Sequence, residues 1–376
     1  MEIKTNAVAV FATLLVQSGC ALAHRGMHHA LGGLSSMMKR QDPPIPVTEL
    51  LADLKTLRDD ELTSAGWTIK NILLINRTAV LPQDLTTVYT APGPLESDEC
   101  RRETCCLWKY IADDMAAAFT DTSTGECNTL ARQAIRLGFH DAATWSKTAG
   151  GGGADGSIIL ADEWKRTENL GVEVIAAQMK EWYRKWHGHG AGMADLIQMS
   201  ANVAAVSCPL GPRTRSFVGR NDSSIPAPEG RLPEVTDDAE TLVALFEDKT
   251  VVLGELIALI GAHTTSRQSF VDISRPEAPQ DTTPGVWDVS WYNETISDNP
   301  SPDIFIFESD LALARYPGAE VFWTTFANPV NNQGAWNNGY AGAYVRLSVL
   351  GVEHINNLVE CTGVLPLRIS DFPGSS

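Results

Sequence analysis

A histidine and an arginine four positions apart could act together on a polar bond. They belong to the stretch RLGFHD at 136–141, where Arg136 and His140 occupy positions i and i+4. In a helix these positions project from the same face, one turn apart. The imidazole could move a proton while the guanidinium stabilises the negative charge left behind. The spacing therefore predicts heterolytic chemistry on a helix that spans 128–141.

A second histidine, His263, ends the apolar run ELIALIGAHT at 255–264. One interpretation is a core histidine bonded to a carbonyl group. The other is a metal ligand, a common role for a neutral imidazole. The residues alone leave both open.

Two clusters of oxygen donors lie near the two histidines in the sequence, and hard oxygen donors of this kind suit Ca²⁺. Ordinary acidic turns are the alternative for each cluster. The first comprises Asp141, Gly153 (carbonyl), Asp155 and Ser157. The second comprises Thr264, Asp281, Thr283, Val286 (carbonyl) and Asp288.

The composition is that of an acidic globular protein. The chain has 376 residues, 44% of them hydrophobic, and a formal net charge of −17. Such a surface repels nucleic acid and anionic membranes, so we expect neither as a partner.

The N-terminus predicts export. Residues 1–23 combine Lys4, an apolar run and the small-residue site Ala21-Leu22-Ala23, as a secretory signal does. The dibasic pair at 39–40 could mark the end of a pro-segment. Sequons at Asn76, Asn221 and Asn293 fit a glycosylated extracellular protein.

Six cysteines remain after the signal, and an even number in an oxidising compartment predicts three disulfides. Counting alone leaves their pairing open, and zinc is the competing interpretation. They are Cys100, Cys105, Cys106, Cys127, Cys208 and Cys361.

The periodicity after Cys100 is helical, and convincing strands are scarce. Residues 24–97 read as an accessory extension with a linker, and leucines between 50 and 57 predict a short helix there. Further helices are expected at 108–119, 128–141, 171–186, 193–205, 236–248, 253–265, 309–315 and 349–359.

Five motifs in the same order resemble those of the plant-type haem peroxidases, and in particular the secreted fungal branch with the lignin and manganese peroxidases. The resemblance runs from about Cys100 to Cys361. The motifs are RLGFHDA (136–142), GGGADGS (151–157), ELIALIGAHT (255–264), DTTPGVWD (281–288) and SDLALAR (309–315).

The resemblance implies a mainly α fold in which two helical lobes, 98–230 and 231–370, sandwich one haem b. It implies that His263 binds the haem iron and that Asp310 accepts its other ring N–H. It implies that His140 moves the peroxide proton. The remaining implied roles are charge stabilisation by Arg136, a pocket wall at Phe139 and orientation of His140 by Asn169.

The resemblance also identifies both oxygen clusters as Ca²⁺ sites and suggests three disulfides. We expect Cys127–Cys208, Cys106–Cys361 and Cys100–Cys105, with Cys105–Cys361 as the alternative to the second. Pro226-Ala227-Pro228 resembles the segment that lines the haem-access channel.

Departures from the fungal pattern restrict the expected electron donor. The acidic residues of the manganese-oxidising members correspond here to Thr129, Gln133 and Ser269, none of them a carboxylate. The exposed redox tryptophan of the lignin-type members corresponds to Ala258. Gln280 stands where fungal relatives have phenylalanine, and the sequence gives no account of it.

We therefore expect a secreted, monomeric haem peroxidase that reduces hydrogen peroxide and oxidises small phenolic or similar aromatic donors. One alternative is a lignin-degrading peroxidase that works through another surface tryptophan. A second is a calcium-stabilised binding protein without haem. The tryptophans available for the first alternative are Trp145, Trp164, Trp182, Trp186, Trp287 and Trp336, for which core packing is the competing interpretation.

Overall fold

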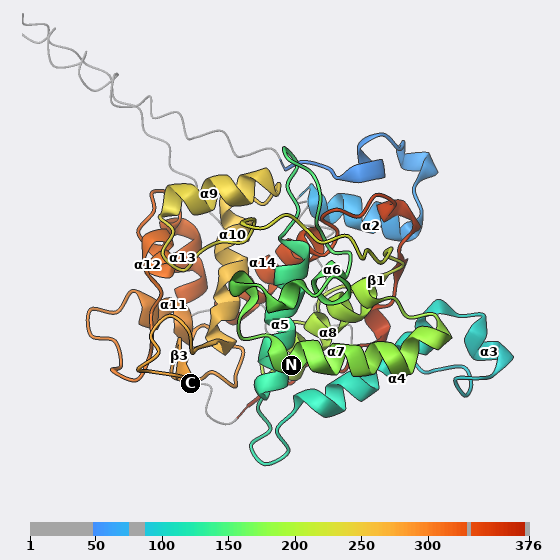
Figure 1. The fold of residues 1–376 in the computed structure, drawn as a ribbon, viewed down its shortest axis with the longest axis horizontal. Coiled ribbons are helices and arrows are strands. Elements are labelled where there is room, and N and C mark those ends of the chain that lie inside the picture. Colours follow the sequence, from blue (N-terminus) through green and yellow to red (C-terminus); the bar gives the residue numbers. More distant parts are fainter. Residues whose placement is uncertain (1–47, 75–86, 329–331, 373–376) are drawn as a thin grey trace, which may run out of the picture. The chain divides into compact units, whose positions relative to one another are not determined.

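A computed structural model describes residues 48–74, 87–328 and 332–372 of the chain. The expected signal peptide, the dibasic pair at 39–40 and the first sequon at 76–78 lie outside these residues. The described part is mainly α, as the sequence predicts (Figure 1). None of its helices combines the length and apolar character needed to cross a membrane.

The helices of the N-terminal half gather around one buried helix, α8 (Met193–Ser207) (Figure 1). Every residue of α8 is buried, as expected for a helix that is apolar on nearly all sides. The helices packed on it are α4 (Thr104–Phe119), α5 (Thr129–Ala142), α6 (Ser157–Leu160) and α7 (Glu173–Trp186). The short α3 (Asp98–Arg101) packs on α4.

The helices of the C-terminal half pack around α10 (Leu253–Ile260) and α14 (Asn332–Leu347). α10 leads directly into the 3₁₀ turn η6 (Gly261–Thr265), which carries His263. The other members are α9 (Ala239–Asp248), α11 (Ser290–Thr295), α12 (Glu308–Ala314) and α13 (Glu320–Ala327).

Side chains at helix starts explain where two of the important helices begin. Asn128 accepts a hydrogen bond from the Ala131 amide at 3.1 Å and starts α5. Asp238 accepts one from the Thr241 amide at 2.8 Å and starts α9. Both are favoured N-cap residues, because their oxygens satisfy otherwise unpaired N–H groups.

Strands are short in the described residues and form two antiparallel pairs. β1 (Phe217–Val218) pairs with β4 (Val359–Glu360), and Phe217 lies opposite Glu360. β2 (Arg267–Gln268) pairs with β3 (Ala278–Pro279) as a hairpin that follows His263. In Figure 1 β3 lies near the lower end of α10, where η6 begins.

The helix expected at 349–359 is wrong. α14 ends at Leu347, and Gly351 then adopts a φ of 75°, which breaks the helical path. A Cβ at Gly351 would lie 2.6 Å from the Gly152 carbonyl oxygen, so the chain passes very close to the glycine-rich loop. Residues 355–357 form a 3₁₀ turn, and the strand β4 follows.

The helix expected at 253–265 is α-helical only to Ile260. Gly261 is crowded, since a Cβ there would lie 2.3 Å from Tyr292 Oη and 2.5 Å from Trp336 Nε1. The chain tightens into the 3₁₀ turn at this residue. His263 is therefore presented from a tight turn rather than from a regular helix.

Residues 48–74 are built into the core. Leu54 and Ile69 are fully buried, and α2 (Ser64–Leu73) packs against α14. The leucines near 50 form a 3₁₀ turn, Ala52–Lys55, rather than the expected α-helix. Arg346 of α14 donates to the carbonyls of Glu49 (2.9 Å) and Leu73 (2.5 Å), which fastens both ends of the segment.

The three disulfides are Cys127–Cys208, Cys105–Cys361 and Cys100–Cys106. The first is as expected, the expected pairs Cys106–Cys361 and Cys100–Cys105 are wrong, and the alternative pair Cys105–Cys361 is confirmed. Cys105 and Cys106 are consecutive in α4, so their side chains point about 100° apart. Cys105 lies beside the Glu360 carbonyl (3.4 Å), which brings it to Cys361, while Cys106 faces the segment of Gly93 and pairs with Cys100.

Candidate active site

Arg136 and His140 meet on one face of α5. Arg136 Nε donates to His140 Nε2 at 3.1 Å, and Arg136 Nη1 donates to the Leu170 carbonyl at 2.5 Å. Burial lowers the pKa of Arg136 to about 10, so it stays charged at neutral pH. A permanent positive charge is thus fixed beside the imidazole.

The hydrogen bond at His140 Nδ1 shows which ring nitrogen carries the proton. The Asn169 amide nitrogen donates to the Glu163 carbonyl at 2.9 Å, so its oxygen faces His140 Nδ1 at 2.7 Å. Nδ1 must then carry the proton, and Nε2 is left with its lone pair. Burial, and next the charge of Arg136, lower the pKa of His140 to about 3. His140 is therefore neutral at physiological pH, and Nε2 is the nitrogen that carries its free lone pair.

Glu163 is a residue that the sequence reasoning missed. Its side chain is buried, accepts from the Ala227 amide at 2.9 Å and pairs with Arg166 at 3.2 Å. Its carbonyl also holds Asn169. Glu163 thus connects the Pro226–Pro228 segment with the residue that orients His140. An acid at this position has the appearance of a solvated surface residue in the sequence.

Phe139 stands next to the catalytic pair. Its ring meets that of His140 edge-on, with centroids 5.7 Å apart, and stacks on Phe246 at 6.1 Å. It is partly buried against the core. This placement agrees with the wall of a pocket.

On the opposite lobe, His263 is held by a buried carboxylate. Its Nδ1 lies 3.0 Å and 3.1 Å from the two oxygens of Asp310, which is fully buried on α12. The rings of Trp291 and Phe307 meet the imidazole edge-on, each with centroids 5.7 Å away. Because Nδ1–H is engaged, Nε2 is the nitrogen left to bind a metal.

The two imidazoles belong to one site. A positive charge on His263 would lower the pKa of His140, so the two rings lie near enough to interact. A histidine whose Nδ1–H is held by a carboxylate is the ligand that peroxidase haem iron takes. The residues present therefore fit a haem, which His263 would hold and whose site Arg136 and His140 would line.

The first oxygen cluster is assembled between α5 and α6. Asp141 is buried and accepts from the amides of Gly156 (3.2 Å) and Ile158 (3.4 Å). Asp155 accepts from the Ser157 amide at 2.9 Å, and the Gly153 carbonyl lies in the same loop. Burial, and then the charge of Asp155, raise the pKa of Asp141 well above its usual range. Two carboxylates crowded in this way fit a bound cation.

The second oxygen cluster follows β3. Thr264 donates to Asp281 at 2.5 Å and lies 3.5 Å from the Val286 carbonyl, and Asp288 accepts from the Ser290 amide. Burial raises the pKa of both Asp281 and Asp288. The buried Thr283 hydroxyl lies close enough to Asp288 to act on its pKa, but it forms no hydrogen bond of good geometry within the described residues. A poorly satisfied hydroxyl among two buried carboxylates fits Ca²⁺.

Each candidate calcium site has only two carboxylates. Within the described residues no group of three or more His, Cys, Asp or Glu side chains could hold a metal. Hydroxyl and carbonyl oxygens would have to complete both sites, as Ca²⁺ permits.

Thr129, Gln133 and Ser269, the positions that correspond to manganese ligands in the fungal relatives, make other hydrogen bonds here. Gln133 accepts from the Ile175 amide, and Thr129 accepts from Arg132 at 2.7 Å. Ser269 donates to Glu277 at 2.7 Å, a carboxylate that the sequence reasoning missed. Glu277 is not alone, because the charges of Arg267, Glu277 and a second carboxylate, Glu126, all act on Arg132. A cationic side chain therefore stands in this region beside the acid.

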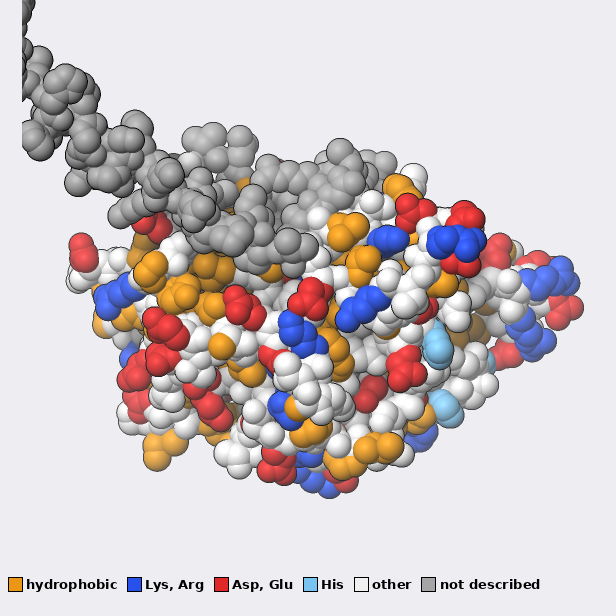
Figure 2. All heavy atoms as spheres, turned by 90° about the horizontal axis from the view of Figure 1, so that it is seen from above, with side chains coloured by type: hydrophobic (Ala, Val, Ile, Leu, Met, Phe, Trp, Pro, Cys, Tyr) orange, Lys and Arg blue, Asp and Glu red, His pale blue; other side chains and the backbone are white. Residues whose placement is uncertain are grey.

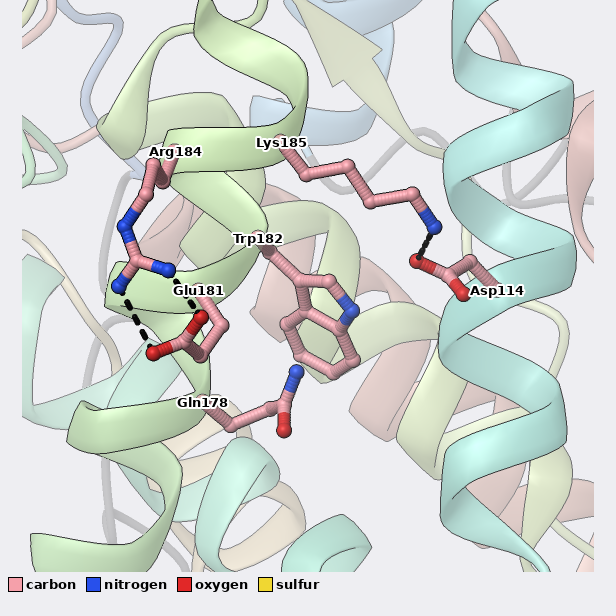
Figure 3. Close-up of a pocket in the computed structure, with 6 residues that line it drawn as sticks. All are labelled: Asp114, Gln178, Glu181, Trp182, Arg184 and Lys185. Carbon is pink, nitrogen blue, oxygen red and sulfur yellow. Dashed lines mark hydrogen bonds and ion pairs between the residues drawn. The ribbon is translucent and has the colours of Figure 1, made fainter.

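The tryptophans considered as electron relays are largely buried. Trp182 lies against Phe119 in an edge-on contact and lines a shallow surface pocket on α7 (Figure 3). Ion pairs between Lys185 and Asp114 (2.8 Å) and between Arg184 and Glu181 border that pocket. Trp287 and Trp336 are fully buried and stack at 4.9 Å. Both carboxylates that line this pocket, Asp114 and Glu181, are engaged in these ion pairs (Figure 3).

The surface carries acidic and basic side chains side by side, as the face in Figure 2 shows. The two sequons within the described residues, at Asn221 and Asn293, are exposed and could accept a glycan.

Comparison with known proteins agrees with this geometry. The model of the family described as Peroxidase matches residues 111–329. The chain is 30% identical to the low-redox potential peroxidase of Taiwanofungus camphoratus, over 70% of this chain and 78% of that protein. It is 29% identical to ligninase LG2 of Phanerodontia chrysosporium (72% and 77%) and 30% to manganese peroxidase H4 of the same fungus (70% and 74%). These nearly equal identities do not choose between electron donors.

Proposed function

This chain belongs to the peroxidase family and is a haem-dependent peroxidase, and from that premise we propose that it oxidises small phenolic or similar aromatic donors. Hydrogen peroxide is the oxidant, and each donor molecule gives up one electron. The proposed enzyme lacks the manganese site. The protein acts in the extracellular space and as a monomer.

The mechanism assigns each side chain of the site one task. His263 would hold the haem iron through Nε2, with Asp310 on its other nitrogen. When bound, the haem supplies the redox centre that takes the oxidising equivalents of peroxide. His140 Nε2 takes a proton from one peroxide oxygen and returns it to the departing oxygen, so that water leaves. Arg136 stabilises the negative charge on that oxygen.

The observation that carries the proposal is the continuous hydrogen-bonded row from Glu163 through Asn169 and His140 to Arg136. It leaves Nε2 of a buried histidine unprotonated and directs a fixed cation to it. A core histidine with a purely structural role requires no such arrangement. We further propose that one Ca²⁺ at each oxygen cluster secures the chain next to His140 and His263.

The absence of a manganese site is supported by Thr129, Gln133 and Ser269, which supply no carboxylate. The half-buried Trp164 is a poor relay, because the Lys165 and Lys180 ammonium groups lie 5.2 Å and 4.6 Å from its ring centroid. Asp162 accepts from the indole N–H at 2.9 Å and pairs with both lysines, so it offsets only one of the two positive charges. A nearby cation makes removal of an electron from the indole harder. Neither special oxidation site of the fungal relatives is therefore part of the proposal.

A donor panel tests the substrate. With haem, Ca²⁺ and a fixed peroxide concentration, the kcat/KM for guaiacol-type phenols should exceed that for Mn²⁺ by at least roughly 10–100-fold. Removing a residue that only hydrogen-bonds a metal ligand already lowers activity by that factor, so the lack of the ligands themselves should cost at least as much. The variant T129E/Q133E/S269D restores three carboxylates and should gain Mn²⁺ oxidation. Wild-type protein that oxidises Mn²⁺ as efficiently as phenols would refute the proposed donor.

Export is tested by the mature N-terminus. Residues 1–23 are proposed to be removed, and the three disulfides and the exposed sequons support an oxidising route. Protein recovered from the culture medium should begin after Ala23, or after Arg40 if a pro-segment is also cleaved. Retention of residues 1–23 in that protein would contradict the proposal.

A further inference from the structure

Gln280 is a fully buried side chain whose polar atoms are unexplained. Neither its amide oxygen nor its amide nitrogen has a hydrogen-bond partner among the described residues. Buried polar groups are normally paired, with protein or with ordered water, because leaving one unpaired is costly. Gln268, on the neighbouring strand, shows the usual situation, with its amide bonded to the backbone of Asp272 and Arg275.

The backbone of Gln280 is tied to the turn that carries His263. The Gln280 amide donates to the Ser266 carbonyl at 3.2 Å, and the Ser266 amide donates to the His263 carbonyl at 2.8 Å. On its other side, the Phe305 amide donates to the Pro279 carbonyl at 2.7 Å. The segment of Phe305 continues through Phe307, which touches the His263 ring, into α12. Gln280 is thus joined to both segments that hold His263 and Asp310.

The carboxylate of Asp310 can accept more hydrogen bonds than it receives. Its carboxylate is fully buried, and its side-chain hydrogen bonds within the described residues are the two contacts with His263 Nδ1. A carboxylate can accept about four hydrogen bonds. A buried amide without an acceptor and a buried acceptor with few donors therefore occur in neighbouring segments.

We propose that Gln280 is a positioning residue for the His263–Asp310 pair, and that its amide reaches the Asp310 carboxylate through a buried water molecule. A water that donates to Asp310 withdraws charge from the carboxylate, so Asp310 draws the Nδ1 proton of His263 less strongly. The imidazole is then less anionic and stabilises oxidised iron less. This inference rests on the proposed role of His263.

The test compares Q280M with wild type. Methionine keeps the length of the side chain and removes both polar atoms. If a hydrogen-bond network joins Gln280, a buried water and Asp310, Q280M should have a lower ferric/ferrous midpoint potential than haem-loaded wild type. It should also have a lower Tm. An amide that is simply unpaired predicts the opposite stability change, a Tm raised by about 2–4 °C, with no change in potential. That result would overturn the proposal.

Two further variants separate a specific effect from general damage. Q268M removes an amide with known backbone partners, and should lower Tm without moving the potential. Q280N keeps a shorter amide and should keep the potential near that of wild type even where Q280M folds poorly. A shift in Q280N as large as that in Q280M would count against the network. Failure of the wild-type protein to bind haem, read from its Soret band, would instead refute the proposed function.

Discussion

At the scale of single residues, the site depends on which nitrogen of His140 carries a proton. Asn169 decides this through an amide that Glu163 holds in one orientation. Burial and Arg136 keep the other nitrogen free. The basicity of His140 is therefore set by three neighbours from separate parts of the chain.

Replacing Asn169 with Ala should slow the reaction with peroxide by roughly 10²-fold, the lower end of what a positioned base contributes. The Asn169 bond raises the pKa of His140, whose wild-type value is about 3, so its loss lowers that pKa further. The acid limb of the pH–rate profile, expected near pH 3 in wild type, should move to lower pH while the plateau falls. Stopped-flow kinetics of the haem-loaded protein measures both.

The control is N202A, which removes a buried asparagine bonded to Ser216 Oγ, outside the site. It should leave the plateau and the limb in place. If the acid limb of the pH–rate profile of N169A moved to higher pH instead, Asn169 would not be the acceptor for the N–H of His140 Nδ1.

Some of these residues could be predicted from the sequence, and some could not. Arg136 and His140 are recognisable because a spacing of four has one meaning on a helix. Glu163 acts through its backbone carbonyl and through a chain segment 64 positions away, so no local pattern marks it. The partner of Cys361 depends on whether Cys105 or Cys106 faces β4. The positions of the cysteines in the sequence do not determine how α4 is rotated about its axis, so they cannot decide between the two.

At the scale of elements, two loops are organised by buried carboxylates. Asp141 and Asp155 close the turn after α5, and Asp281 and Asp288 close the turn after β3. Asp141 directly follows His140, and Asp281 accepts a hydrogen bond from Thr264, the residue after His263. A cation at each pair would neutralise the carboxylates and stiffen the element that carries the histidine.

Removal of Ca²⁺ should destabilise the protein more as the pH rises. Without the metal, burial raises the pKa of Asp141 and Asp281, so folding favours their protonated forms. That stability is present at acid pH and is lost as the pH rises through the raised pKa values. The Tm difference between samples with CaCl₂ and samples stripped of Ca²⁺ at neutral pH and then exchanged into metal-free buffer of each pH should therefore widen from about pH 4 to about pH 8.

The variant D281N should reduce this pH dependence, whereas D298N, at an exposed position, should not. A Tm difference that stays constant or narrows with pH would contradict the assignment of these clusters as cation sites.

Helices with a clear apolar period, such as α5 and α7, could be predicted to within a few residues, and so could the apolar run of α8. α14 could not, because three glycines, Gly334, Gly339 and Gly342, and several asparagines weaken its helical signal. It is stabilised by its neighbours. Gly339 lets it approach α10 and α13, since a Cβ there would lie 3.3 Å from Ala258 and 3.2 Å from Phe326.

At the scale of the described molecule, residues 48–74 are part of the stable structure. They cover α14 with buried leucine and isoleucine side chains and supply backbone acceptors for Arg346. The fully buried guanidinium of Arg346 also pairs with Glu255 on α10 at 3.0 Å. One arginine thus links the early segment to the helix that leads to His263.

I69A should lower the free energy of unfolding by about 3 kcal/mol, through lost burial and the cavity left behind. V321A, at a position 61% exposed, should change it by less than about 0.5 kcal/mol. Urea unfolding of the calcium-replete protein measures both. Equal midpoints for the two variants would mean that residues 48–74 do not contribute to the cooperative unit.

The Cys105–Cys361 bond spans 256 residues, whereas Cys100–Cys106 spans six. On the proposed export route, Cys100, Cys105 and Cys106 would therefore enter the oxidising lumen long before Cys361 has been translated. Cys105 must remain free, or be released from a premature partner, until almost the whole nascent chain has emerged. Secretion of this protein should consequently depend on thiol–disulfide exchange with the cell's oxidoreductases, a demand set by two adjacent cysteines at the start of α4.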